Sequence, residues 1–374
     1  MKQEPPVYVT RALLPSFQDY VEMIRPLWDS HILTNQGTLY FRFKDALTNY
    51  LKVPELVLCA NGHLALEAVL QSLQIHGEVI TTPFTFISTT NAIIRAGLTP
   101  VFCDILSDEY TMDPASIERC ITPNTCAILP VHVFGNLCDM DAIDRLAEHY
   151  HLPVIYDAAH TFGIHQENTN AESFYLRGTA SIISFHATKV FNSVEGGAVI
   201  SKNLDLLNRV FLNTNYGFEN SEISEWVGGN AKMSEFHAAM GLCNLPSVES
   251  EILRRKHVAS LYSELLTGLN EIVLPPTQPG IRSNYAYYPV VFKQGQQVRD
   301  RVYNCLAQCG FYSRRYFYPL TCDHPQVRRI RPSTPISVAQ TISDGILCLP
   351  LYGDLCSEAV ENICKIIMKA LSED

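Results

Sequence analysis

Between residues 56 and 200, short apolar runs alternate with segments of helical periodicity. Runs that are apolar at every position are typical of strands buried on both faces, and amphipathic segments of about ten residues are typical of the helices that cover them. The predicted strands are 56–60, 78–82, 100–103, 127–131, 154–156, 181–184 and 197–200. The predicted helices are 64–73, 89–96, 114–120 and 139–149, with a further one in part of 158–178. This alternation predicts an α/β fold, with a mostly parallel seven-stranded sheet sandwiched by helices.

The pattern changes after residue 247. A long helix is predicted over 250–269, followed by mixed strands and helices. The later strands are 285–292, 310–313 and 346–349, and the later helices are 297–309 and 357–371. We therefore expect a large domain over 1–247, including an N-terminal arm, and a smaller α+β domain over 248–374. The polar segment 217–230, which contains two adjacent glycines, is predicted to be a loop.

Polar residues recur where the predicted strands end. The residues at or near these ends are Asn61, Pro83, Asp104, His132, Asp157 and His186, and all of them except Pro83 are polar. Core packing does not explain such a recurrence. In open α/β sheets, ligands bind at the carboxyl ends of the strands. The sequence therefore predicts a binding site at this edge of the sheet.

The strongest candidates for chemistry are Lys189 and Asp157. Lys189 follows the apolar run 181–184, and Asp157 ends the run 154–156. An enzyme that uses pyridoxal 5′-phosphate (PLP) needs a lysine for the Schiff base and a carboxylate to pair with the pyridinium nitrogen. A lysine in a partly desolvated pocket also has a lowered pKa and can move protons. The alternatives are a solvated surface lysine and an aspartate that only caps a helix.

A second feature is the turn at Asn61, Gly62 and His63, which joins a predicted strand to a predicted helix. Backbone N–H groups at a helix start, with a glycine that allows close approach, form an anion site. A cofactor phosphate would fit there, and the hydroxyl of Ser184 could supply a further donor. Alone, a turn of this kind is weak evidence.

Three further side chains lie near these motifs. An aromatic residue after strand 78–82 could stack on a pyridine ring, although core packing is the usual fate of phenylalanine. His160, three residues after Asp157, could orient that carboxylate or a ring oxygen. His186 is a candidate for the substrate site. A lone histidine, however, is more often simply hydrogen-bonded than catalytic.

Taken together, the motifs resemble the DegT/DnrJ/EryC1/StrS family, which comprises PLP-dependent nucleotide-sugar aminotransferases of fold type I. The resemblance covers most of the chain and rests on residues 32–37, 61–66, 82–86, 130–135, 157–160, 184–189, 229–235 and 316–320. One departure is His63, where the family usually has a serine or threonine hydroxyl for the phosphate.

The resemblance implies roles for individual residues. It implies that Lys189 is the Schiff-base lysine, that Asp157 is the pyridinium partner and that Phe86 stacks on the ring. It further implies the residues that hold the phosphate, which are Gly62, His63, Ser184 and, across a homodimer interface, Asn230. His160 stands where many relatives have glutamine. No metal is implied.

Within the family, residues 157–160 and 185–192 most resemble the branch that aminates a dTDP-4-keto-6-deoxyhexose to a viosamine-type sugar. The resemblance therefore implies transfer of nitrogen from L-glutamate to a nucleotide-linked ketone. Amination at C3 stays open, as does the pathway served, such as the O-antigen of lipopolysaccharide or an antibiotic sugar. The nucleotide is expected near Arg315 and Tyr318, although adjacent arginines could equally form surface salt bridges.

Composition narrows the alternatives. The net charge of −10 disfavours nucleic acid and anionic membranes as partners, because both attract clustered Lys and Arg. No apolar signal or membrane-spanning segment is evident, and the 12 cysteines lack a C-x-x-C motif, so we expect free thiols and a cytoplasmic location. A sugar dehydratase of the same fold is disfavoured by Lys189, because such enzymes carry histidine there. A non-catalytic sensing member and a fold type I lyase are the remaining alternatives.

Overall fold

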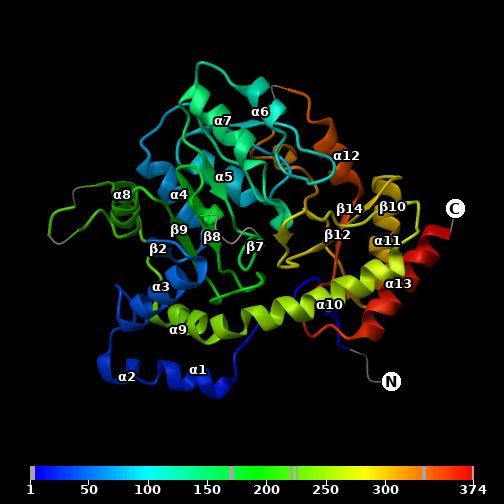
Figure 1. Cartoon of the computed structure of the whole chain (residues 1–374), viewed down its shortest axis with the longest axis horizontal. Helices are drawn as coiled ribbons and strands as arrows, with labels where there is room; N and C mark the ends of the chain where they lie inside the picture. The colour runs from blue at the N-terminus through cyan, green and yellow to red at the C-terminus, as the bar shows by residue number, and fades with distance from the viewer. Residues whose placement is uncertain (1–4, 168–171, 220–221, 225, 331–333, 373–374) are drawn as a thin grey trace.

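The computed structural model describes residues 5–167, 172–219, 222–224, 226–330 and 334–372. Its centre is a sheet of seven strands (Figure 1). The strands are β2 (Leu56–Cys59), β3 (Glu78–Thr81), β4 (Thr99–Phe102), β5 (Thr125–Ile128), β6 (Ile155–Asp157), β8 (Ala180–Ser184) and β9 (Gly197–Ile200). Each overlaps a strand predicted from the apolar runs.

The strands lie in the order β2-β9-β8-β6-β5-β3-β4. Two ladders, β2-β9-β8-β6 and β4-β3-β5, are joined by the parallel bridges Ile128–Val154 and Val131–Asp157. Only β9 runs antiparallel to its neighbours in this sheet. The link from β8 to β9 contains no described helix, and antiparallel neighbours need no crossover helix. The prediction of a mostly parallel sheet is confirmed.

Both faces of the sheet are buried. Successive residues of β2 belong to different cores: Leu56 and Leu58 to one, Val57 and Cys59 to the other. This explains why β2 is apolar at every position and why the other strands are mostly apolar. One core includes residues of α3 (Thr38–Leu51), α7 (Met140–Tyr150) and α9 (Glu235–Asn244). The other includes residues of α4 (Gly62–Ser72), α5 (Ile87–Arg95) and α8 (Leu204–Thr214).

The helix expected in part of 158–178 is a wrong prediction for the residues that the structure describes. They form only a short strand, β7 (His165–Gln166), and a 3-10 turn at Phe174–Leu176, while 168–171 lie outside the described residues. Two tight turns follow Asp157, in which the N–H of Thr161 donates to Ala158 and that of Ile164 to Thr161. Gly163 between them has φ +83°, a left-handed conformation that ends any helix.

The C-terminal part has its own core. Two of its helices, α10 (Val248–Leu266) and α11 (Gln296–Gln308), pack on α13 (Ser357–Ser372), beside the antiparallel strands β12 (Tyr288–Phe292) and β14 (Ile346–Leu349). The remaining elements here are β10 (Ile272–Val273), β11 (Ile281–Arg282), β13 (Phe311–Tyr312) and α12 (Ser337–Gly345). We propose a domain boundary at 247/248, where α10 begins.

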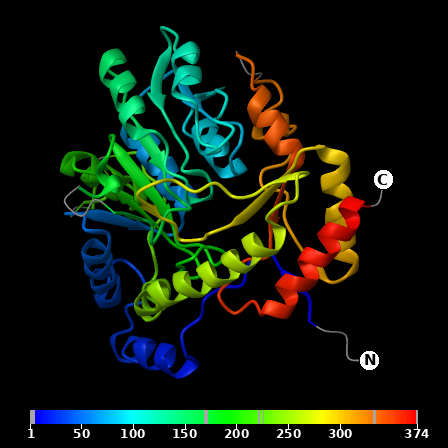
Figure 2. The same cartoon turned by 45° about the vertical axis from the view of Figure 1, so that its right-hand side comes forward.

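The N-terminal arm contacts both parts of the molecule. Its strand β1 (Val7–Tyr8) pairs with β13, so this part of the arm lies beside the C-terminal helices (Figure 2). Its helices α1 (Phe17–Ile24) and α2 (Leu27–Ser30) follow, and α1 packs on α9. Within 5–372, apart from the undescribed gaps, no helix combines the length and apolarity needed to cross a membrane.

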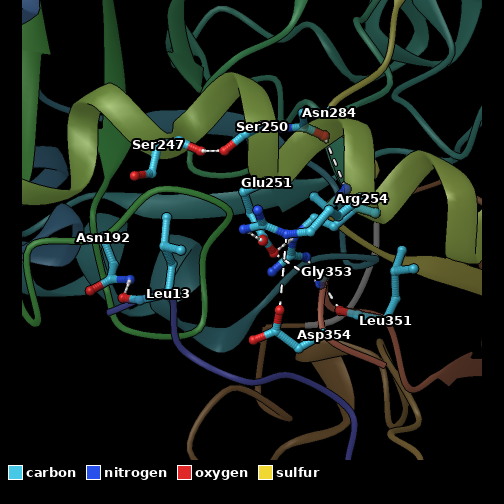
Figure 3. A network of polar contacts seen from close by, with 12 residues as sticks. Leu13, Asn192, Ser247, Ser250, Glu251, Arg254, Asn284, Leu351, Gly353 and Asp354 are labelled. Carbon is cyan, nitrogen blue, oxygen red and sulfur yellow. Dashed lines mark hydrogen bonds and ion pairs between the residues drawn. The ribbon is translucent and has the colours of Figure 1, made fainter. Parts of the chain in front are cut away.

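A buried polar network joins α10 to the C-terminal segment (Figure 3). The carboxylate of Glu251 accepts hydrogen bonds from Arg254, from Arg255 and from the backbone N–H of Gly353, at 2.8, 2.8 and 3.0 Å. The buried guanidinium of Arg255 also donates to the carbonyl of Leu351. Charge-assisted bonds of this kind hold the long helix in a single register against the segment after β14.

Candidate active site

A cavity of about 390 Å³ opens where β2, β3, β6 and β8 end. Eight of the predicted site residues line it: Gly62, His63, Phe86, Asp157, His160, Ser184, His186 and Lys189. Residues far apart in the sequence therefore share one wall, because parallel strands end at the same edge of the sheet. Arg315, Tyr318 and Asn230 do not line this cavity.

Asp157 is buried at the end of β6, and both of its carboxylate oxygens are hydrogen-bonded. Thr89 donates its hydroxyl to Oδ2 at 2.8 Å, and the N–H of Ala159 donates to Oδ1 at 3.1 Å. Burial raises the pKa of Asp157, and the two hydrogen bonds and the nearby charge of Lys189 oppose that rise. A buried carboxylate that faces a cavity is stabilised in its charged form by a cationic partner, such as a protonated pyridine nitrogen.

Lys189 lies in the turn after β8. Its Nζ is 3.5 Å from the hydroxyl oxygen of Tyr287. Burial lowers the pKa of Lys189 to about 8, and Asp157 opposes the shift. The amine is therefore far easier to deprotonate than that of a surface lysine, which suits a nucleophile and proton carrier.

The turn between β2 and α4 forms a narrow cup. Asn61 caps α4 by accepting a hydrogen bond from the N–H of Leu64 at 2.9 Å. A Cβ atom at Gly62 would lie 2.9 Å from Cβ of Ser184, so only glycine allows this approach. The side chain of His63 is hydrogen-bonded through Nδ1 to the hydroxyl of Ser88 at 2.9 Å. Ser88 also lines the cavity, so a hydroxyl is present here although position 63 is not serine or threonine.

The imidazole of His160 is buried in the same wall. Its Nδ1 accepts the backbone N–H of Phe134 at 3.1 Å, which leaves the proton of the neutral ring on Nε2. Burial lowers the pKa of His160 well below its usual value, and the charge of Lys189 adds to that effect. His160 is therefore a neutral donor. It does not contact Asp157 through any hydrogen bond that the described residues show.

Two further predicted residues lie nearer the mouth of the cavity. Phe86 has an exposed ring at the start of α5, so it lies at the cavity rather than in the core. His186 is half-exposed, with Nδ1 2.9 Å from the hydroxyl of Thr188 and Nε2 3.6 Å from the carboxylate of Glu195. Both side chains are accessible to a ligand.

Arg315 and Tyr318 line a second cavity of about 400 Å³. It adjoins the first, since Thr85, Phe86, Tyr316 and Phe317 line both. The guanidinium of Arg315 lies 4.4 Å from the ring centre of Tyr303 and donates to Asp300 at 3.1 Å. A substrate that reaches from one cavity to the other would pass Phe86.

Asn230 lies away from both cavities within its own chain. It is exposed, and it lines a third hollow of about 890 Å³ between α4 and the end of the 217–230 segment. The described part of that segment is largely irregular, as the sequence predicts, apart from a bridge between Asn215 and Asn230. The expectation that Asn230 serves a neighbouring subunit stays a prediction.

Sequence reasoning missed several cavity residues. Thr89 holds Asp157 from α5, and Tyr287, Tyr316 and Phe317 form the wall opposite the sheet. Tyr316 and Phe317 belong to the 316–320 motif of the family resemblance, but nothing in the local pattern assigns them to the cavity, and nothing distinguishes Tyr287 from a core residue. Only the packing of the C-terminal segments over the sheet edge brings them to the cavity.

The lining fits PLP. The cavity is of the size that small cofactors occupy, and it presents one amine, one buried carboxylate and a glycine-lined cup. Asp157 would face the pyridine nitrogen, Lys189 the aldehyde, and the cup of Gly62, His63 and Ser184 the phosphate. No group of His, Cys, Asp or Glu among the described residues is arranged to hold a metal ion.

The comparisons with known proteins agree with this chemistry. A model of the DegT/DnrJ/EryC1/StrS aminotransferase family matches residues 17–368. A dTDP-4-amino-4,6-dideoxy-D-glucose transaminase of Escherichia coli is 38% identical over 366 residues, covering 96% of this chain and 97% of the relative. A protein of the same name from Shigella dysenteriae is 35% identical over 368 residues, covering 97% and 99%.

A solved structure agrees in turn. The crystal structure of DesI in the presence of its TDP-sugar product matches with a TM-score of 0.92 and 29% identity, covering 100% of this chain and 94% of that chain. The predicted fold type, PLP as cofactor and amino transfer as reaction are thereby confirmed. The chain belongs to the DegT/DnrJ/EryC1/StrS aminotransferase family.

Proposed function

We propose that this chain aminates C4 of dTDP-4-keto-6-deoxyglucose, with L-glutamate as the amino donor. The observation that carries the proposal is the full-length similarity to two transaminases named for dTDP-4-amino-4,6-dideoxy-D-glucose. The adjoining cavities support it, because a sugar beside Lys189 leaves room for a nucleotide beside Arg315 and Tyr318. A guanidinium suits a diphosphate.

PLP, when bound, carries the amino group between the two substrates and withdraws electrons from the reacting carbon. Asp157 would supply the negative charge that pairs with the pyridine nitrogen of the cofactor. Hydrogen bonds from Thr89 and from the N–H of Ala159 orient the carboxylate of Asp157. Lys189 takes the proton from the α-carbon of the donor through Nζ. In the second half of the reaction it delivers a proton to the sugar carbon.

The other cavity residues position the reactants. We propose that Gly62, the N–H of His63 and Ser184 bind the phosphate, that Phe86 covers one face of the pyridine ring and that His160 donates Nε2–H toward the ring oxygen. His186, at the mouth of the cavity, would contact the sugar. The resemblance to the family suggests these roles, and the position of each residue on the lining of the cavity supports them. For His160, the engagement of Nδ1 by Phe134 supports donation from Nε2.

We further propose a cytoplasmic homodimer in which Asn230 completes the phosphate site of the partner. The support is the exposure of Asn230 and the hollow that its segment forms with α4. Val227 in the same segment is 97% exposed, an apolar surface that a second copy would cover.

Incubation with glutamate and a panel of nucleotide-linked 4-keto and 3-keto sugars tests the substrate. We expect a new amino group on C4 of the dTDP sugar, located by NMR, together with 2-oxoglutarate. Preferred amination of a 3-keto sugar would refute amination at C4 and support the alternative, amination at C3. Turnover of glutamate with simple keto acids, and with no sugar of the panel, would refute both.

A further inference from the structure

The hydroxyl of Tyr287 faces the amine of Lys189. The two atoms are 3.5 Å apart, and Tyr287 lines the cavity together with Lys189, Asp157 and His160. Among the hydrogen bonds of the described residues, this is the only one made by that hydroxyl. Within the described part of the chain, the amine of Lys189 is therefore the group with which this buried phenol pairs.

Three neighbouring rings hold the ring of Tyr287. Their centres lie 4.9 Å away at His160, 5.4 Å at Phe134 and 5.8 Å at Tyr316. The contacts are tilted or edge-on, arrangements that aromatic rings favour. The phenol therefore has little freedom to turn away from Lys189.

The backbone that carries Tyr287 is also fixed to the sheet edge. The buried amide of Asn284 donates to the carbonyls of His160 and Phe162 at 2.8 and 2.9 Å, and accepts the N–H of Ala286 at 3.1 Å. Asn284 thus ties the segment before β12 to the turn after Asp157. The position of the hydroxyl is set from the C-terminal part, whereas the amine belongs to the sheet.

The hydroxyl can serve the amine in either charge state. Burial raises the pKa of Tyr287, so the phenol keeps its proton. A neutral amine accepts that proton in a hydrogen bond, whereas an ammonium group donates to the phenol oxygen. Asp157 accepts the hydroxyl of Thr89 and the N–H of Ala159, and the described residues show no hydrogen bond between Asp157 and Lys189.

We propose that Tyr287 is the positioning residue that holds Nζ of Lys189 in line for proton transfer. The proposal rests on the role given to Lys189 above, and it does not depend on which sugar is the substrate. Tyr287 neither gains nor loses a proton overall. It restricts where the amine points while Lys189 moves the proton.

Tyr287→Phe removes only the hydroxyl, and the neighbouring Tyr288→Phe is a matched control. The Tyr288 hydroxyl lies 2.9 Å from Ser263 in the C-terminal core, away from the cavity. In single turnovers of the loaded enzyme with glutamate, we expect Tyr287→Phe to slow the proton-transfer step about tenfold. With α-deuterated glutamate, the isotope effect on kcat should rise. Tyr288→Phe should change neither quantity, and cofactor affinity should stay equal in both variants.

A second measurement does not use the reaction. Competitive acetylation of the full-length, cofactor-free chain across pH, read by mass spectrometry at Lys189, gives the pH at which the amine becomes reactive. We expect a midpoint near 8 in the parent. The midpoint should be lower in Tyr287→Phe, because both charge states lose a hydrogen bond and the bond made by the charged ammonium form is the stronger one.

The outcomes distinguish the positioning role proposed for Tyr287 from the buried environment assigned to Lys189. Equal turnover rates and equal midpoints in Tyr287→Phe and the parent would overturn the role of Tyr287. Equal slowing in Tyr287→Phe and Tyr288→Phe would overturn it too, since only general packing would then be at work. A parent midpoint near that of an ordinary lysine would instead refute the environment assigned to Lys189.

Discussion

The two walls of the cavity differ in origin and in chemistry. The sheet wall, with Asp157 and Lys189, carries the buried carboxylate and the reactive amine. The opposite wall, with Tyr287, Tyr316 and Phe317, is aromatic and comes from the C-terminal part of the chain. In the proposed mechanism the sheet wall supplies the charged carboxylate and the proton-carrying amine. The aromatic wall positions that amine through Tyr287, and its residues Tyr316 and Phe317 also border the second cavity. Substitutions in the sheet wall should therefore abolish the reaction, whereas substitutions in the aromatic wall should alter its rate without abolishing it.

Lys189→Ala should have the largest effect. Loss of the amine removes both the attachment point of the cofactor and the proton carrier, so we expect the rate to fall by at least about 10⁴-fold. The absorbance of the attached cofactor in the visible range should disappear. Lys202→Ala is the control, because Lys202 pairs with Glu172 on the surface. A Lys189→Ala variant with the parental spectrum would disprove the assignment.

Asp157→Asn should come next, at about a 100-fold loss in kcat. The amide keeps the size of the side chain but removes the charge that holds the pyridine nitrogen protonated. Asp104→Asn is a matched control, because Asp104 is also a buried carboxylate after a strand but accepts the N–H groups of Val338 and Ala339 at the start of α12. The control should lower the melting temperature and leave kcat intact. The reverse result would place the essential charge elsewhere.

Arg315→Gln tests the second cavity. If Arg315 binds the diphosphate, KM for the nucleotide sugar should rise about tenfold, because a hydrogen bond to a charged group is lost. The half-reaction with glutamate serves as an internal control and should keep its rate. Equal effects on both halves would show that Arg315 acts through its structural contacts with Asp300 and Tyr303.

His132→Asn should have the smallest effect on the reaction, and its effect on the pH dependence of stability should be confined to acid. His132 is buried, its Nδ1 accepts the N–H of Cys138, and burial lowers its pKa to about 3. Between pH 6.5 and 3 the unfolded chain binds the proton that the folded chain refuses. Stability from this residue is therefore present above pH 6.5 and lost as the pH falls.

Urea unfolding at pH 7 and at pH 5 measures how much the free energy of unfolding changes with pH. One such group contributes at most about 1.4 kcal/mol per pH unit. The variant should lose less stability than the parent between the two values, since asparagine does not titrate. A parallel decline in parent and variant would contradict the assignment of a neutral buried imidazole.

Local pattern alone predicted much of the sheet wall. Each of the seven strands was visible as a mostly apolar run, because burial on both faces favours apolar residues at successive positions. Asp157, Ser184 and the Gly62 turn followed from the rule that ligands bind where such strands end. The helix predicted in part of 158–178 was wrong. The composition there is typical of a helix, but the described residues form successive tight turns around Gly163, which has a left-handed conformation.

The roles of single residues need contacts that local pattern does not contain. Sequence reasoning could nominate Lys189 but could not show that its amine meets Tyr287. It could nominate His160 but not that Nδ1 is already engaged by Phe134. Arg315 and Tyr318 were placed near the substrate by resemblance, and they lie in an adjoining cavity.

The sequence by itself determined the order of strands and helices, the family and the amine–carboxylate pair at the sheet edge. These depend on periodicity and on residues close to strand ends, which are local properties. Only the tertiary structure decided which aromatic residues close the cavity, which hydroxyl faces the amine and that β9 runs antiparallel. The first two outcomes depend on how the C-terminal part packs across the sheet edge, and the third depends on how β9 pairs with β2 and β8. Such long-range contacts leave no periodic trace in the chain.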